Sequence, residues 1–303
     1  MPLRFSIRRK FVLAFLGLSL VPLMILGFTT LESLRAIGEH AIESSTLQLE
    51  QRAREALELR AVDLAHRVSQ FLHACEADLF TLRMMPRRAE VYRDFSAIHS
   101  RTVWTREGTN EDFVEVHREL PLYREVAFIG PDGMERIRIL DNRIVEVGGL
   151  RDVSRPENTT YKSEDYFAQA CRLAEGEVFT SHVTGWYVSQ QEQLQGAGSP
   201  EEAVEGRKYE GVVRMATPCF SPAGRFEGIV MLSIDHRHLM ELTLHILPTE
   251  ERLVVFPSYS SGNYAFMFDD EGWIISHPKY SNIRGVSSDG SFFDPAHPSY
   301  NRE

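Results

Sequence analysis

The most pronounced hydrophobic pattern is a charge-free apolar run near the N-terminus, from Phe11 to Leu31, reading FVLAFLGLSLVPLMILGFTTL. About 20 apolar residues in a helix are needed to cross the hydrocarbon of a bilayer. Pro22 lies inside the run, but membrane helices tolerate proline better than soluble ones do. The pattern therefore predicts a transmembrane helix over residues 11–31.

Residues 1–10 are basic, with Arg4, Arg8, Arg9 and Lys10 immediately before the apolar run. Positive charge next to a membrane helix favours the cytoplasmic side, which predicts a cytoplasmic tail and export of everything after residue 31. The alternative is a cleaved secretory signal, but Gly27-Phe28-Thr29 is a poor small-x-small cleavage site. Both alternatives place the remainder of the chain outside the cytoplasm.

The next pattern is helical, from Glu32 to about Met85, with very few glycines or prolines, and we assign residues 32–95 to one long exported helix. The apolar positions at helical spacing are Leu34, Ile37, Ala41, Leu49, Ala53, Ala56, Leu64, Val68, Phe71, Cys75, Leu79 and Leu82. Such an amphipathic helix would extend about 80 Å, more than one small domain can cover. We therefore expect a homodimer through this helix; packing on its own domain alone is the alternative.

From Glu125 onward the pattern changes to short apolar strands separated by turn signals. Three β-hairpins are predicted, at residues 124–140, 209–235 and 263–278. Their turns are Pro131-Asp132-Gly133, Ser221-Pro222-Ala223-Gly224 and Asp269-Asp270-Glu271-Gly272, in which glycine supplies the positive φ.

The segments between the hairpins complete the prediction of an α+β fold. A short helix containing Tyr166 and Phe167 is expected to start at Ser163 and to be stopped by Gly176. Residues 178–183 then predict a strand, residues 190–206 an exposed loop, and residues 238–246 a helix ended by Pro248. Because the first and third hairpins share one pattern, we interpret the chain as two copies of one module, the second cut short at Glu303.

Composition supports a folded domain and narrows its partners. Hydrophobic residues make up 43% and charged residues 25% of the 303, as in ordinary globular proteins. The net charge of -10 argues against nucleic acid as a partner. Cys75, Cys171 and Cys219 form no CxxC pair, so no zinc or redox motif is predicted; a Cys171–Cys219 bridge stays open for an oxidising compartment.

The order of these features resembles the double Cache domains, the exported PAS-like input domains of bacterial chemoreceptors and sensor kinases. The most specific stretches are Tyr166-Phe167-Ala168-Gln169-Ala170, Gly176-Glu177-Val178-Phe179 and VVRMATPCFSPAGRFEGIVMLSID. The resemblance implies two antiparallel-sheet modules: a membrane-distal one over residues 96–240 and the start of a membrane-proximal one over residues 241–303. It also implies an inner-membrane sensor that binds a small molecule in the distal module and passes the signal through the long helix.

One departure from the family concerns the ligand. Amino-acid-binding relatives carry Arg-x-Trp-Tyr before the short helix, and an Asp after the next strand. This chain has Ser163-Glu164-Asp165-Tyr166 and then Ser181-His182 at those places, so the resemblance does not support an amino-acid ligand.

The predicted ligand-binding residues combine aromatic faces, hydroxyl groups and guanidinium groups, which suit a small polar ligand or a carboxylate. They are Arg136, Arg138, Tyr161, Tyr166, Thr180, His182, Trp186, Tyr187 and Arg214. Arg136 and Arg138 are two residues apart and are expected to share a side of their strand, and a solvated face is their alternative. Arg214 interrupts an otherwise apolar strand, which favours a functional or paired role. For Trp186 and Tyr187 the alternative is core packing.

No catalytic motif of the HExxH, GxSxG, GxxxxGK[ST] or GxGxxG type occurs in the sequence, so neither an enzyme nor a cofactor is predicted. His236-x-His238 next to Asp235, with His245 further on, lacks a convincing third metal ligand, and no metal site is predicted. Two other hypotheses remain: an anchored hydrolase that uses this histidine cluster, and a ligand-free scaffold. The scaffold predicts that side chains fill the region around Tyr166, Trp186 and Arg214.

Overall fold

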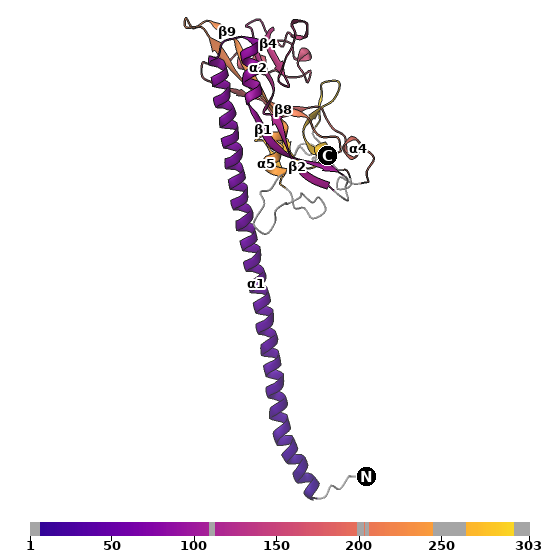
Figure 1. Ribbon diagram of the computed structural model, residues 1–303. Helices are drawn as coiled ribbons and strands as arrows, with labels where there is room; N and C mark the ends of the chain where they lie inside the picture. The colour runs from indigo at the N-terminus through magenta and orange to yellow at the C-terminus, as the bar shows by residue number, and fades with distance from the viewer. Residues whose placement is uncertain (1–6, 109–112, 199–202, 204–205, 245–264, 294–303) are drawn as a thin grey trace. The chain divides into compact units, whose positions relative to one another are not determined.

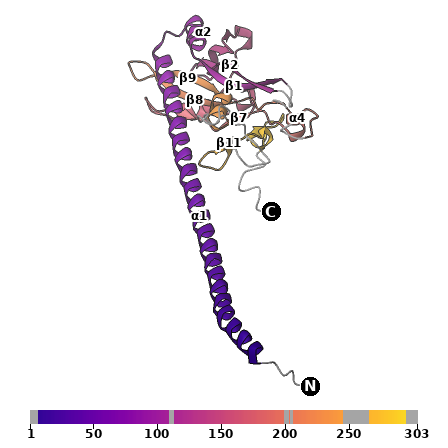
Figure 2. The same cartoon turned by 60° about the horizontal axis from the view of Figure 1, so that its bottom comes forward.

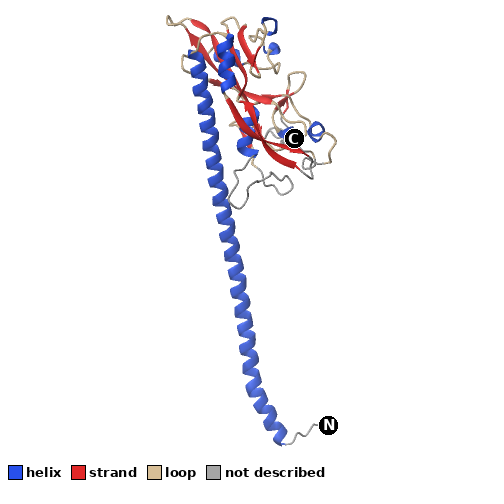
Figure 3. Cartoon of the chain, viewed as in Figure 1, coloured by secondary structure: helices blue, strands red, loops and turns tan. Residues whose placement is uncertain are grey.

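The computed structural model describes residues 7–108, 113–198, 203, 206–244 and 265–293. The chain divides into two compact units, Met1–Asp63 and Leu64–Glu303. The described residues of the first unit are all helical, and the second unit combines helices with antiparallel sheets, as the colouring of Figure 3 shows. The fold class is therefore α+β, as predicted.

Helix α1, Ile7–Met84, is continuous through the predicted membrane span and most of the predicted exported helix. It ends at Met84 rather than near residue 95, because Pro86 disfavours helical geometry at the residue before it and cannot donate a backbone hydrogen bond. A separate helix, α2, Ala89–Ile98, follows.

Among the described residues, α1 is the one helix that is long and apolar enough to cross a membrane. Large apolar side chains in its first part expose about two thirds or more of their surface: Phe11, Phe15, Leu18, Leu23, Leu26, Phe28 and Leu31. Such a dense band of exposed apolar side chains is unfavourable in water and favourable in lipid.

The main sheet of the second unit has seven antiparallel strands, in the order β5-β4-β3-β9-β8-β6, with β7 also paired to β8. The strands are β3 (Tyr123–Ile129), β4 (Glu135–Leu140), β5 (Arg143–Ile144), β6 (Phe179–Thr180), β7 (Thr184–Gly185), β8 (Gly211–Phe220) and β9 (Phe226–Asp235). The first two predicted hairpins, β3–β4 and β8–β9, are confirmed. Gly133 and Gly224 adopt φ of 82° and 74° in their turns.

The two faces of this sheet bury different partners, because alternate residues of a strand point to opposite sides. Val126, Val213 and Leu232 share one core with side chains of α1 and α2, among them Leu79 and Phe95. Figures 1 and 2 both show the C-terminal end of α1 beside β8 and β9. We call the opposite side the inner face.

The inner face carries Ala127, Ala216 and Met231, which pack with Tyr166 and Phe167. These two aromatic residues belong to a short helix, α3, Tyr166–Ala170. Helix α3 therefore covers the inner face of the sheet, where the resemblance places a ligand.

Several elements differ from prediction. The short helix begins at Tyr166 and ends at Ala170, so Ser163 does not start it and Gly176 does not stop it. Of the expected strand over 178–183, only Phe179 and Thr180 form a strand, β6, and β7 begins one residue beyond the predicted range, at Thr184. Ser189 and Glu192 form a capping box that starts α4, Gln190–Leu194, inside the expected loop. These are errors of local extent, since short elements depend on tertiary contacts.

An antiparallel ribbon formed by β1, Ser100–Gly108, and β2, Phe113–Pro121, was not predicted from the sequence. The later helix, α5, His236–Leu244, begins two residues earlier than predicted; Ile246 and Pro248 lie outside the described residues. All three cysteines are free, so the possible bridge between Cys171 and Cys219 is not formed.

The third hairpin is confirmed as a separate small sheet of β10, Met267–Phe268, and β11, Ile274–Ser276. Strands β12, Gly285–Val286, and β13, Phe292–Phe293, form another. Three single-turn 3₁₀ helices complete the described chain: Val147–Gly149, Pro156–Asn158 and Tyr280–Asn282.

Candidate functional site

Six charged side chains meet on the inner face of the main sheet, three acidic and three basic. We call them the charge cluster: Glu125, Glu135, Glu164, Arg138, Arg151 and Arg214. The formal charges balance, as a buried set of charges requires, since an unpaired charge in a protein interior is strongly unfavourable.

Arg214 on β8 is the most deeply buried member, with 1% of its surface exposed. Its Nε and Nη2 donate to the two carboxylate oxygens of Glu164, the second bond at 3.1 Å, which makes the pair bidentate. Its Nη1 donates to Glu125 Oε2 at 2.7 Å and to Ser233 Oγ at 2.5 Å. The guanidinium thus joins the sheet to the segment that precedes α3.

Glu125 on β3 lies between the arginines. Its Oε1 accepts hydrogen bonds from Arg138 Nε at 2.5 Å and from Arg151 Nη2 at 3.2 Å. Arg151 Nη2 also donates to Glu135 Oε1 at 3.1 Å, and the Arg151 backbone N–H donates to Glu135 Oε2 at 2.9 Å. The cluster therefore ties together β3, β4, β8 and the loop after β5.

The electrostatics follow from burial and pairing. Burial alone would raise the pKa of the Glu125 carboxyl, but the guanidinium groups of Arg214 and Arg138 lower that pKa to about 2. Burial opposes the charge on Arg214 as well, yet Glu164 and Glu125 raise the pKa of Arg214 well above its ordinary value. Glu125 and Arg214 therefore stay charged at neutral pH, and Glu125 is a poor general base.

Glu164 reaches the cluster from the loop that covers the inner face. Its Oε2 accepts a hydrogen bond from the Tyr161 backbone N–H at 3.1 Å, and its own N–H donates to Thr159 Oγ1 at 3.3 Å. Lys162 adopts a left-handed φ of 60°, which turns the chain sharply within this loop. The carboxylate thus fixes both its own loop and Arg214.

Two buried polar atoms at the cluster have no hydrogen-bond partner among the described residues: the hydroxyl of Tyr166 and Nε of Arg151. The Tyr166 ring lies 4.9 Å from Cζ of Arg214, and 1% of the residue is exposed. Burial raises the pKa of the Tyr166 phenol, so this group is a neutral donor. Unpaired buried donors in a native site call for an explanation, and a role in binding a ligand is one.

The structure brings together three of the nine predicted ligand-binding residues: Arg138, Tyr166 and Arg214. Tyr161 is next to them through its backbone bond to Glu164, and its ring meets Trp186 edge-on, with centroids 5.5 Å apart. The environment around Arg214 is thus filled by side chains, as the scaffold hypothesis predicts.

The other four residues lie apart from the charge cluster. Arg136 is exposed and pairs with Asp132 at 2.6 Å, and Thr180 is exposed on β6. His182 Nδ1 is 2.6 Å from Asp269 Oδ2, in the turn of the third hairpin. Tyr187 packs edge-on against Phe293, with centroids 4.4 Å apart.

The expectation that Arg136 and Arg138 share a strand side is wrong, and the reason is a β-bulge. Ile129 pairs with Glu135 and Phe128 pairs with Ile137, so Arg136 has no partner in the ladder. The extra residue shifts the alternation, which turns Glu135 and Arg138 to the inner face and leaves Arg136 in solvent.

Four members of the cluster were not predicted from the sequence: Glu125, Glu135, Glu164 and Arg151. Glu125 carried a usable signal, because it occupies an inward position of an apolar strand, as Arg214 does on its own strand. Two opposite charges at such positions predict a buried pair. Glu164 and Arg151 lie in loops and gave no signal in the periodicity.

The histidines considered for metal binding are engaged with backbone carbonyls. His236 Nε2 donates to the Ile275 carbonyl, and His238 Nε2 is 3.0 Å from the Pro121 carbonyl. Both lie at the start of α5, not on a strand end, so their rings do not share one side; His245 falls outside the described residues. No group of three His, Cys, Asp or Glu side chains in the described ranges could hold a metal ion.

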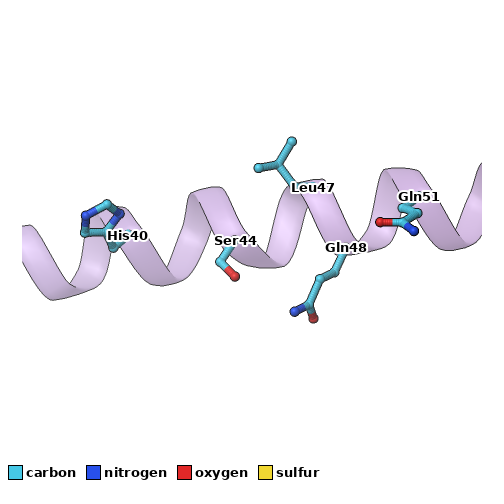
Figure 4. Close-up of a pocket in the computed structure, with 5 residues that line it drawn as sticks. All are labelled: His40, Ser44, Leu47, Gln48 and Gln51. Atoms are coloured by element: carbon cyan, nitrogen blue, oxygen red, sulfur yellow. The ribbon is translucent and has the colours of Figure 1, made fainter.

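The first unit has a hollow of its own, shown in Figure 4 and lined by His40, Ser44, Leu47, Gln48 and Gln51. All five side chains come from α1. One helix surface cannot enclose a small molecule, so this hollow is weaker than the charge cluster as a candidate binding site.

Comparisons with known proteins give matches among solved structures; no family model and no curated protein matches. One match is the extracellular domain of a protein described as a histidine kinase, with 16% identity, a TM-score of 0.44 and coverage of 78% of this chain and 73% of that one. Another is a domain of a Vibrio parahaemolyticus protein described as sensory box/GGDEF family, with 14% identity, a TM-score of 0.44 and coverage of 77% and 73%.

A third match is the sensory domain of a Campylobacter jejuni chemoreceptor with isoleucine bound, with 12% identity, a TM-score of 0.39 and coverage of 72% and 67%. These three matches are described as a histidine kinase, a sensory box/GGDEF family protein and a chemoreceptor, which agrees with the resemblance to double Cache domains. With TM-scores below 0.5, the likeness identifies neither a ligand nor an output for this chain.

Proposed function

We propose that this chain is the extracytoplasmic sensing part of a single-pass membrane receptor of the chemoreceptor or sensor-kinase type, anchored in a bacterial inner membrane by residues 11–31. In this proposal a small molecule binds on the inner face of the sheet and alters how α3 and its loop are held there. Helix α1 connects that domain with the membrane.

The observation that carries the proposal is the buried hydroxyl of Tyr166, which has no hydrogen-bond partner among the described residues, while the ring of the same residue lies against Arg214. A purely structural cluster gains stability by pairing every buried donor, and this one leaves a donor unpaired. The donor belongs to the first residue of α3, which packs on the inner face, and a small polar ligand bound there would complete the set.

A ligand-free scaffold is the second candidate, and the bidentate bond between Glu164 and Arg214 favours it. A guanidinium already satisfied within the chain has no need of a ligand. The two candidates differ in whether any small molecule stabilises the folded chain.

The ligand test uses the full chain in detergent, screened by thermal unfolding against small carboxylates, amines, sugars and purines. A ligand that binds the native state alone stabilises it by about 2.7 kcal/mol at a concentration of 100 times its Kd. We expect at least one class to raise the Tm. If no compound in a wide screen changes the Tm, the scaffold is the better account.

The same sample tests the expected homodimer. Within residues 32–63, large apolar side chains expose half or more of their surface: Leu34, Ile37, Ile42, Leu47, Leu49, Leu57, Leu59 and Val62. A second copy is the simplest partner for this band. Light scattering, corrected for bound detergent, should give twice the mass of one chain; a single-chain mass at all concentrations would contradict the dimer.

A further inference from the structure

Glu164 binds Arg214 in the way that a free carboxylate would. Its two oxygens take the Nε and Nη2 donors on one edge of the guanidinium, the geometry in which arginine recognises carboxylates bidentately. Glu125 instead takes a single donor, Nη1, on the other side of the group. Arg214 thus has one edge fixed to the sheet and one edge bound to a carboxylate from a covering loop.

Glu164 is buried, but the residues on either side of it reach solvent. Asp165, immediately after it, is exposed, and Ser163, immediately before it, is half-buried. An outward turn of one side chain would therefore carry the Glu164 carboxylate toward water, without moving a strand. The volume that this carboxylate leaves is the volume that the carboxylate of a small ligand would need.

A ligand could accept hydrogen bonds from buried donors that Glu164 leaves unpaired. The buried Tyr166 hydroxyl and Nε of Arg151 lack acceptors among the described residues. A ligand with a second polar group beside its carboxylate could pair with the phenol, whose ring lies against Arg214. Such a ligand would replace both bonds of Glu164 and satisfy one further donor.

We infer that Arg214 is the receptor for a small carboxylate ligand, and that Glu164 occupies it as an internal substitute when the ligand is absent. This inference rests on the proposed sensing function and names its ligand class. Binding would release the loop of residues 159–165 from the sheet, since Glu164 is its tie to Arg214.

The test is a chemical rescue in the full chain in detergent. Glu164→Ala removes a CH2–COO⁻ unit, and acetate matches that unit in size and charge. We expect acetate to bind the wild type weakly and the variant about tenfold more tightly, as when the binding-competent fraction rises from about a tenth to nearly all. Calorimetry gives the two dissociation constants, and acetamide should bind neither protein.

The matched control is Glu210→Ala. Glu210 pairs with Arg124 at 3.3 Å but is largely exposed, so its removal changes the charge equally and frees an arginine already in contact with water. Tighter acetate binding by the Glu164 variant alone supports the inference. Equal affinities in all three proteins, no binding to the Glu164 variant, or no binding to the wild type would each overturn it.

If Glu164→Ala does not fold, Glu164→Gln replaces it, because the amide keeps the shape of the side chain and loses its charge. Failure of the inference is distinguishable from failure of the sensing proposal. A wild type that is stabilised by an amine or a sugar but by no carboxylate remains a sensor, with Arg214 in a structural role.

Discussion

His236 is a buried titratable residue outside the charge cluster, and its surroundings decide its protonation state. The ring is fully buried, meets Tyr209 edge-on with centroids 5.0 Å apart, and donates to the Ile275 carbonyl. Burial lowers the pKa of His236 to about 4. The folded chain therefore holds this imidazole neutral, whereas the unfolded chain protonates it near pH 6.5.

This difference predicts the pH dependence of stability. Because the folded pKa lies below the unfolded one, the unfolded chain binds the extra proton between pH 6.5 and about 4, and stability falls as the pH drops through that range. Replacing the ring by His236→Gln should flatten the slope by about 1.4 kcal/mol per pH unit, as urea unfolding at pH 7, 6 and 5 would measure.

An exposed histidine, His73, is the control for that measurement, and Glu125 acts only in a more acidic range. His73 is exposed, with 75% of its side chain accessible, so His73→Gln should leave the slope as it is. The lowered pKa of Glu125, about 2, gives stability that is present above its ordinary pKa of 4.5 and lost only at more acidic pH. Identical slopes for the wild type and the His236 variant would contradict a neutral buried ring.

Among the elements, the β8–β9 hairpin contains a glycine turn that the sequence predicts and a strand distortion, at a second glycine, that it does not predict. Gly224 in the turn has φ of 74°, and a Cβ there would meet nothing within 4 Å. Gly228 in β9 has φ of 129°, and a Cβ there would lie 2.1 Å from the Ile129 carbonyl oxygen of β3. The second glycine therefore permits β3 and β9 to approach one another.

We predict that Gly228→Ala destabilises the domain much more than Gly224→Ala does. The turn substitution bears the conformational cost of positive φ, about 1 kcal/mol, while the strand substitution adds a backbone clash inside the sheet and should exceed about 3 kcal/mol. Urea unfolding of both variants measures the difference. Equal losses would mean that the close approach of β3 and β9 is not required.

The hairpins could be predicted because their signals are local: apolar strands around glycine turns. The β1–β2 ribbon was missed because its first strand, SRTVWTREG, mixes polar and apolar side chains without a clean alternation, although its second, FVEVHRELP, alternates Val114 and Val116 with Glu115 and His117. Two of the six members of the charge cluster, Arg138 and Arg214, could be predicted. Arg214 stood out in an apolar strand, but its partner Glu164 lies 50 residues away in a loop. A β-bulge reversed the side on which Arg136 was expected.

The whole molecule combines an apolar helical segment suited to lipid with a sheet domain whose inner face holds buried, balanced charge. The sensing proposal requires one membrane topology, in which residues 11–31 lie in the bilayer and everything after them lies outside the cytoplasm. The chain carries a natural probe for this arrangement, because Cys171 is exposed while Cys75 and Cys219 are buried.

The most direct test is labelling of intact bacterial cells with a membrane-impermeant maleimide. Cys171 should react without lysis, Cys171→Ser should abolish the labelling, and Ser6→Cys in that background should react only after the membrane is opened. Protection of Cys171 in intact cells, with labelling only after lysis, would contradict an extracytoplasmic sensing domain.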